Sequence, residues 1–127
     1  MKKILSAKDL IVYKKAFSLS MEIFHVSKTF PKEEVYSLTS QIRRSSRSVC
    51  LNLSEAWAKR RYEAHFISKL TDCDAENSET STAIDYAFKC EFIDTLTHRN
   101  FKSQNDEIGR MLGAMINDPK PFLIIKK

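Results

Sequence analysis

Residues 41–61 read QIRRSSRSVCLNLSEAWAKRR, and the spacing of the apolar residues in and around this stretch decides the fold class. No glycine or proline interrupts the longer segment 33–60. Apolar side chains that recur at steps of three, four and seven gather on one face of an α-helix. We therefore expect a helix over 33–60 that buries one face. The residues of that face are Leu38, Ile42, Val49, Leu53 and Ala56.

The same periodicity predicts helices over 8–29, 63–89 and 97–116. The first is expected to begin at an approximate capping box, Ser6 with Asp9, and to end before Pro31. Its predicted inward stripe is Leu10, Tyr13, Phe17, Met21 and Phe24, flanked by Ala16, Ser20 and Ile23. The third face is Phe66, Ile67, Leu70, Cys73, Asn77, Thr80, Ile84 and Ala87 or Phe88, and the fourth is Phe101, Asn105, Ile108, Leu112 and Met115.

Four helices with short connections favour an all-α, antiparallel four-helix bundle in up-down-up-down order. A chain of 127 residues is expected to form a single domain over 1–127. Three cysteines without a C-x-x-C pair (Cys50, Cys73 and Cys90) favour buried, reduced thiols and a cytoplasmic protein. We expect neither a signal peptide nor a membrane-spanning helix, because the chain has no long apolar run.

The chain carries 21 basic and 16 acidic side chains, a net charge of +5, and these charges are unevenly distributed. Residues 62–94 hold eight acidic and two basic side chains, whereas each of the other three segments is basic. We expect the acidic third helix to compensate part of the basic charge within the bundle or assembly. The net charge alone is therefore weak support for a nucleic-acid partner.

A polar stripe runs along segment 33–60 beside its apolar face, with residues three and four apart. This pattern is typical of a helix that is contacted on two sides, although a solvated flank would show the same pattern. We predict an interhelical or intersubunit interface at Gln41, Ser45, Asn52 and Glu55. The acidic residues Asp72, Glu76 and Glu79 are expected to face basic residues of the same or a neighbouring chain.

Basic residues occupy the outward face and the end of the same helix. A cluster at a helix C-terminus can simply compensate the helix dipole. Together with the outward face it could also contact phosphates, and Trp57 and Tyr62 beside it could stack on bases or pack in the core. The predicted nucleic-acid or partner contacts are Arg43, Arg44, Arg47, Lys59, Arg60 and Arg61.

Catalytic patterns are sparse, and we expect neither an enzyme nor a cofactor. Both glycines lie in the fourth segment, so the chain has no glycine-rich phosphate loop. Glu22-x-x-His25 has the spacing used by di-iron bundles, which need a second such pair and two further glutamates. A carboxylate-bridged metal oxidase that uses Asp72, Glu76 and Glu79 is a remote alternative.

The stretch QIRRSSRSVCLNLSE over 41–55, followed by Lys59-Arg60-Arg61, resembles the 23S rRNA-intervening-sequence protein family. FPKEEVYSL over 30–38, FISKL over 66–70, ENSET over 76–80 and EIGRMLGAMI over 107–116 extend the likeness to about 8–122. It implies a four-helix bundle that assembles as a homopentamer. Ala56 and Ala58 stand where many members have glycine, which favours a longer continuous second helix.

The resemblance also extends to the accessory variability protein of diversity-generating retroelements, whose basic pentameric surface binds a reverse transcriptase and nucleic acid. From these observations we expect a non-catalytic, homo-oligomeric scaffold or adaptor, with RNA, DNA or a protein as further partner and no contact with a membrane. Direct RNA or DNA binding, as an accessory protein for a reverse transcriptase or ribosomal RNA, is the alternative.

Overall fold

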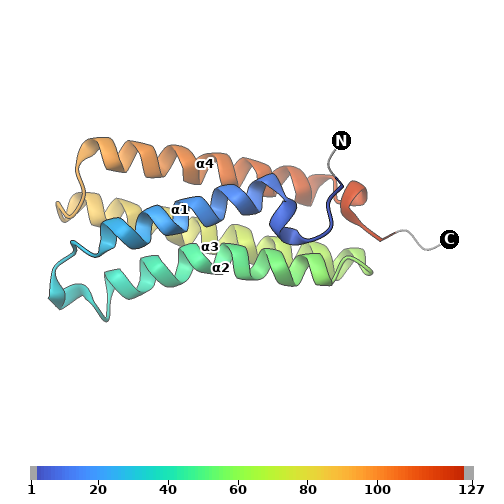
Figure 1. The fold of residues 1–127 in the computed structure, drawn as a ribbon, viewed down its shortest axis with the longest axis horizontal. Helices are drawn as coiled ribbons and strands as arrows, with labels where there is room; N and C mark the ends of the chain where they lie inside the picture. The colour runs from blue at the N-terminus through green and yellow to red at the C-terminus, as the bar shows by residue number, and fades with distance from the viewer. Residues whose placement is uncertain (1–2, 125–127) are drawn as a thin grey trace.

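The computed structural model describes residues 3–124 and is an all-α bundle (Figure 1). Its four helices are α1 (Ile11–Ser27), α2 (Leu38–Ala58), α3 (Glu63–Lys89) and α4 (Thr95–Asn117). The chain reverses direction at each connection, and α1 packs against both α2 and α4. The prediction of an all-α four-helix bundle is confirmed. Among the described residues no helix is long and apolar enough to cross a membrane.

Three helices begin at different residues from those expected. A 3-10 turn over Ala7–Asp9 takes up the Ser6 capping box, and extended Leu10 separates this turn from α1. A second 3-10 turn over Lys32–Glu34 precedes α2, which starts only at Leu38. Asp94 accepts a hydrogen bond from the Thr97 amide at 2.8 Å and starts α4 two residues early. Local hydrogen bonds at the helix starts therefore make α1 and α2 shorter than predicted and α4 longer.

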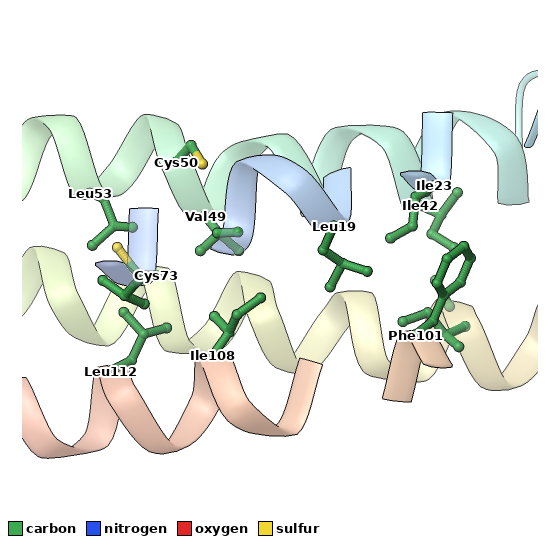
Figure 2. Close-up of a cluster of buried hydrophobic side chains, with 14 of the residues drawn as sticks. Leu19, Ile23, Ile42, Val49, Cys50, Leu53, Cys73, Phe101, Ile108 and Leu112 are labelled. Atoms are coloured by element: carbon green, nitrogen blue, oxygen red, sulfur yellow. The ribbon is translucent and has the colours of Figure 1, made fainter. Parts of the chain in front are cut away.

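The core lies along the bundle axis and draws residues from all four helices (Figure 2). The faces predicted for α2 and α4 are buried, including Ile42, Leu53, Ile108 and Leu112. Most of the predicted α3 face is also buried, and only Ile67 and Phe88 are partly exposed. The apolar periodicity of these three helices was therefore sufficient to orient them.

The inward face predicted for α1 is only partly correct. Leu10 and the flanking Ala16, Ser20 and Ile23 are buried as expected, whereas the larger residues of the predicted stripe are not. The buried residues of α1 are Val12, Ala16, Leu19, Ser20, Ile23 and Ser27. In that stripe Phe17 is 51% exposed and Met21 39% exposed, while Tyr13 and Phe24 are half-buried. We call Tyr13, Phe17, Met21 and Phe24 the α1 aromatic stripe. The bundle buries the smaller side chains of α1 and leaves much of this apolar surface in contact with solvent.

Two buried amides join α3 to α4 in the middle of the bundle. Asn105 donates from Nδ2 to Oδ1 of Asn77 at 2.9 Å and to the Asn77 carbonyl at 3.0 Å. Asn77 in turn donates from Nδ2 to the Asn105 carbonyl at 3.0 Å. Gly109 faces this pair, and a Cβ there would lie 3.3 Å from Asn77 Nδ2. The reciprocal hydrogen bonds meet the polar requirement of the buried amides and fix the register of the two helices.

The three thiols are all free but differ in environment. Cys50 and Cys73 are buried, and burial raises the pKa of each thiol to about 12. At neutral pH these two groups therefore stay protonated and unreactive. Cys90 is exposed at the C-terminal end of α3, so the prediction of a buried thiol is wrong for this residue.

Candidate nucleic-acid interface on α2

Two cations on the outward face of α2 and one at the C-terminal end of α1 gather around one aromatic ring of α1. The guanidinium carbons of Arg43 and Arg47 lie 4.9 and 5.5 Å from the centroid of the Phe24 ring. Lys28 Nζ lies 4.8 Å from the same centroid. Arg43 also donates from Nε to the Ser27 hydroxyl at 2.8 Å. Phe24 therefore holds positive charge on the surface where α1 meets α2. We call Lys28, Arg43 and Arg47 the Phe24 cation cluster.

Within residues 3–124 no carboxylate forms an ion pair with the Phe24 cation cluster. Arg44, one position away on α2, differs from its neighbours. Its Nη2 lies 2.6 Å from Glu79 Oε1 of α3, and its Nη1 lies 3.6 Å from Glu76 Oε1. The hydrogen bond and the charge of Glu79 raise the pKa of Arg44. The charge of Arg44 is thus compensated by carboxylates of the same chain, whereas the charges of Arg43 and Arg47 are available to a partner.

The basic cluster at the end of α2 is also divided. Arg60 stacks on Trp57 with its guanidinium carbon 3.6 Å from the ring, and donates to the carbonyls of Trp57 and Phe122. Burial lowers the pKa of Arg60, which has a structural role at the C-terminal segment. Lys59 and Arg61 are exposed on either side of it. These two side chains remain free to contact a phosphate.

A groove of about 450 Å³ runs beside the N-terminal half of α2. Tyr36, which is 95% exposed, lies at one end, and Leu51 at the other. The full lining is Val35, Tyr36, Thr39, Ser40, Arg43, Arg44, Arg47, Ser48 and Leu51. The predicted contact residues did not include Tyr36 or Thr39. Tyr36 lies in the connection before α2, and Thr39 lies in the first turn of α2.

Two of the residues predicted for an interhelical or intersubunit interface, Ser45 and Glu55, contact α3 of the same chain. Ser45 is fully buried and accepts a hydrogen bond from Thr80 of α3 at 2.9 Å. Lys69 of α3 forms ion pairs with Glu55 and Asp72. Its Nζ lies 2.5 Å from Glu55 Oε2 and 3.3 Å from Asp72 Oδ2. These contacts lie between or along α2 and α3 of the same chain.

The other predicted interface residues either face solvent or bond locally. Gln41 is exposed, and Asn52 donates from Nδ2 to the Ser48 carbonyl on its own helix at 2.9 Å. Glu76 and Glu79 both face Arg44. The acidic charge of α3 is therefore largely directed at cations of the same chain.

The carboxylates of α3 that could serve as metal ligands lie beside cations. Among the described residues no group of three or more His, Cys, Asp or Glu side chains is placed to hold a metal ion. Asp72 faces Lys69, and Glu76 and Glu79 face Arg44, so each predicted ligand lies against a cation. This arrangement gives no support to the metal-oxidase alternative.

Comparison with known proteins places this bundle in a family. The family model of the 23S rRNA-intervening sequence protein matches residues 8–114, which include α1, α2 and α3 complete. The chain belongs to the 23S rRNA-intervening sequence protein family. The matched residues contain the Phe24 cation cluster and the groove, so the candidate interface lies within the part shared with this family.

One solved structure similar to this family member is a protein of unknown function from the S23 ribosomal protein family of Bacteroides thetaiotaomicron. The two chains are 26% identical with a TM-score of 0.77, and the match covers 87% of this chain and 98% of the other. No curated protein matches this member of the 23S rRNA-intervening sequence protein family.

Proposed function

We propose that this chain is a non-catalytic, homo-oligomeric scaffold that contacts RNA or DNA through the outward face of α2. The observation that carries the nucleic-acid contact is the Phe24 cation cluster. Arg43 and Arg47 are held side by side on one aromatic ring, border a groove, and form no ion pair among the described residues. Cations arranged in this way bind phosphates without regard to base sequence.

Arg43 and Arg47 lie on α2, and Lys59 and Arg61 lie at and beyond its C-terminal end. Lys59 is 12 residues beyond Arg47, which corresponds to about 18 Å along the helix axis and about 120° around it. A nucleic-acid backbone carries charges at intervals short enough to reach both ends of this span. Arg44 and Arg60 are left out of the proposed contact because α3 and Trp57 engage them. We expect the affinity to fall as the salt concentration rises.

The α1 aromatic stripe supports the proposed self-association. Phe17 and Met21, which lie about one helical turn apart, are both exposed. Apolar side chains at helical spacing that the bundle does not bury are typical of a surface covered by another subunit. Most soluble oligomers are built from identical chains, so we assign the exposed part of this surface, Phe17 and Met21, to a second copy. Phe24 stays with the proposed nucleic-acid contact. The family resemblance implies five copies.

Replacing Phe17 and Met21 together with glutamate is expected to convert the assembly into monomers. The two charges would have to be buried without partners in the proposed interface, which costs far more than an exposed substitution. Light scattering coupled to size exclusion at micromolar concentration measures the change. The wild type is expected at five times the mass of one chain and the variant at one.

Leu96→Glu is the matched control, because Leu96 is exposed near the start of α4, away from the α1 aromatic stripe. It should leave the mass of the assembly unchanged. A wild type that has the mass of a single chain would contradict the proposed self-association. An assembly that persists in the doubly substituted variant would exclude α1 as its interface.

A further inference from the structure

The groove beside α2 contains a buried hydroxyl that no contact of the bundle uses. Thr39 lines the groove and is 5% exposed, and among the described residues its Oγ1 has no hydrogen-bond partner. Nearby hydroxyls of α2 are satisfied, since Ser46 and Ser48 donate to the carbonyls of Arg43 and Arg44. Buried polar groups are nearly always hydrogen-bonded. Oγ1 has almost no contact with solvent in the described structure, so a ligand in the groove would reach this unused donor after a rotation of the Thr39 side chain.

A carboxylate already caps the first amide of α2. Glu34 Oε1 accepts hydrogen bonds from the Ser37 hydroxyl at 2.7 Å and from the Leu38 amide at 3.3 Å. The next amides, those of Thr39 and Ser40, have no carbonyl four residues earlier within the helix. The positive charge of the groove therefore comes from Arg43 and Arg47, and these two amides add hydrogen-bond donors.

The end of the groove offers a flat apolar surface. Tyr36 is almost fully exposed, and Val35 beside it is also exposed. Such a ring gains nothing from packing in the described bundle, but it can stack on a nucleobase. Tyr36 and Thr39 line one groove together with Arg43 and Arg47. The groove thus combines groups suited to a phosphate with a ring suited to a base.

We infer that this groove binds one nucleotide unit of a single-stranded RNA or DNA, with its phosphate among Thr39, Arg43 and Arg47 and its base on the ring of Tyr36. The inference rests on the proposed nucleic-acid contact and specifies its ligand. A duplex keeps its bases stacked in pairs and offers the groove only phosphates. The groove therefore distinguishes single strands from duplexes, which charge alone does not do.

Tyr36→Ala tests the stacking contact with a fluorescently labelled single-stranded RNA of 12 nucleotides and a duplex of the same sequence. Loss of one base–aromatic stack is expected to weaken single-strand binding by about fivefold or more, with duplex binding unchanged. Tyr36→Phe keeps the ring and should bind as the wild type does. Tyr86→Ala, at an exposed tyrosine of α3, is the matched control and should also bind normally.

Thr39→Val tests the hydroxyl, because valine has nearly the same shape but cannot donate a hydrogen bond. Single-strand affinity is expected to fall by about tenfold, as for the loss of a hydrogen bond to a charged group. The thermal midpoint of unfolding should not fall, because the hydroxyl has no partner to lose within the described bundle. A lowered midpoint would instead give Thr39 a structural role and would overturn its place in the site.

The two levels of the proposal fail in different ways. If Tyr36→Ala and Thr39→Val both bind single strands as the wild type does, while charge reversal at Arg43 and Arg47 abolishes binding, the nucleotide site is wrong and the nucleic-acid contact stands. Equal losses for single strand and duplex in Tyr36→Ala would also overturn the stacking contact. If the wild type binds neither these RNAs nor the single-stranded and duplex DNA of the same sequence, both proposals fail.

Discussion

Replacing Arg43 and Arg47 together with glutamate is expected to weaken binding to a short single-stranded RNA by about 100-fold or more. Each exchange removes an attraction to phosphate and introduces a repulsion at the same position. The effect is large because these two cations border the groove and have no carboxylate partner among the described residues. Fluorescence anisotropy at low salt measures the loss.

Arg99→Glu together with Arg110→Glu is the matched control for this prediction. Both arginines are exposed on α4, and the net charge changes by the same amount. If contact is made at α2, the RNA affinity of the control should stay within about threefold of that of the wild type, since only the long-range attraction changes. Equal losses in the two double variants would assign binding to the net charge of the protein and would contradict an interface on α2.

Replacing Asn105 with alanine is expected to lower the free energy of unfolding by about 2–4 kcal/mol. The change leaves Oδ1 of Asn77 without its donor in the interior, and an unmet buried polar group costs about 1–3 kcal/mol. The lost side-chain volume adds a cavity. Chemical denaturation monitored by circular dichroism measures the difference.

Asn100→Ala is the control, because Asn100 is an exposed asparagine on the same helix. It should change the free energy of unfolding by less than about 0.5 kcal/mol. Replacing both Asn77 and Asn105 with leucine should lower the free energy of unfolding by less than the sum of the Asn77→Leu and Asn105→Leu effects. In the double variant no side-chain amide is left without a partner. Full additivity would show that the two amides contribute independently.

Periodicity predicted the number of helices and the faces of α2, α3 and α4, because each of these helices has one clear apolar sector. It failed at α1, where two apolar stripes lie side by side. The larger residues, Tyr13, Phe17, Met21 and Phe24, indicated the wrong face. Size and hydrophobicity alone do not show which stripe faces the neighbouring helices, since α1 packs closely against both α2 and α4.

The candidate site was only partly predictable for a related reason. All of its cations could be found in the sequence, but their availability depends on distant residues. Arg44 is neutralised by Glu79, which lies 35 positions away, and Arg60 is held by Trp57 and Phe122. Tyr36 lines the groove from the connection before α2, because α2 starts only at Leu38, and that start depends on local hydrogen bonds of Glu34.

The most direct test of the central claim, that free cations on the outward face of α2 bind nucleic acid, is the salt dependence of wild-type binding to a labelled single-stranded RNA. Two to four phosphate contacts predict that the logarithm of the association constant falls against the logarithm of salt concentration with a slope of about −1.5 to −3. A slope near zero, or no binding at low salt, would contradict the claim.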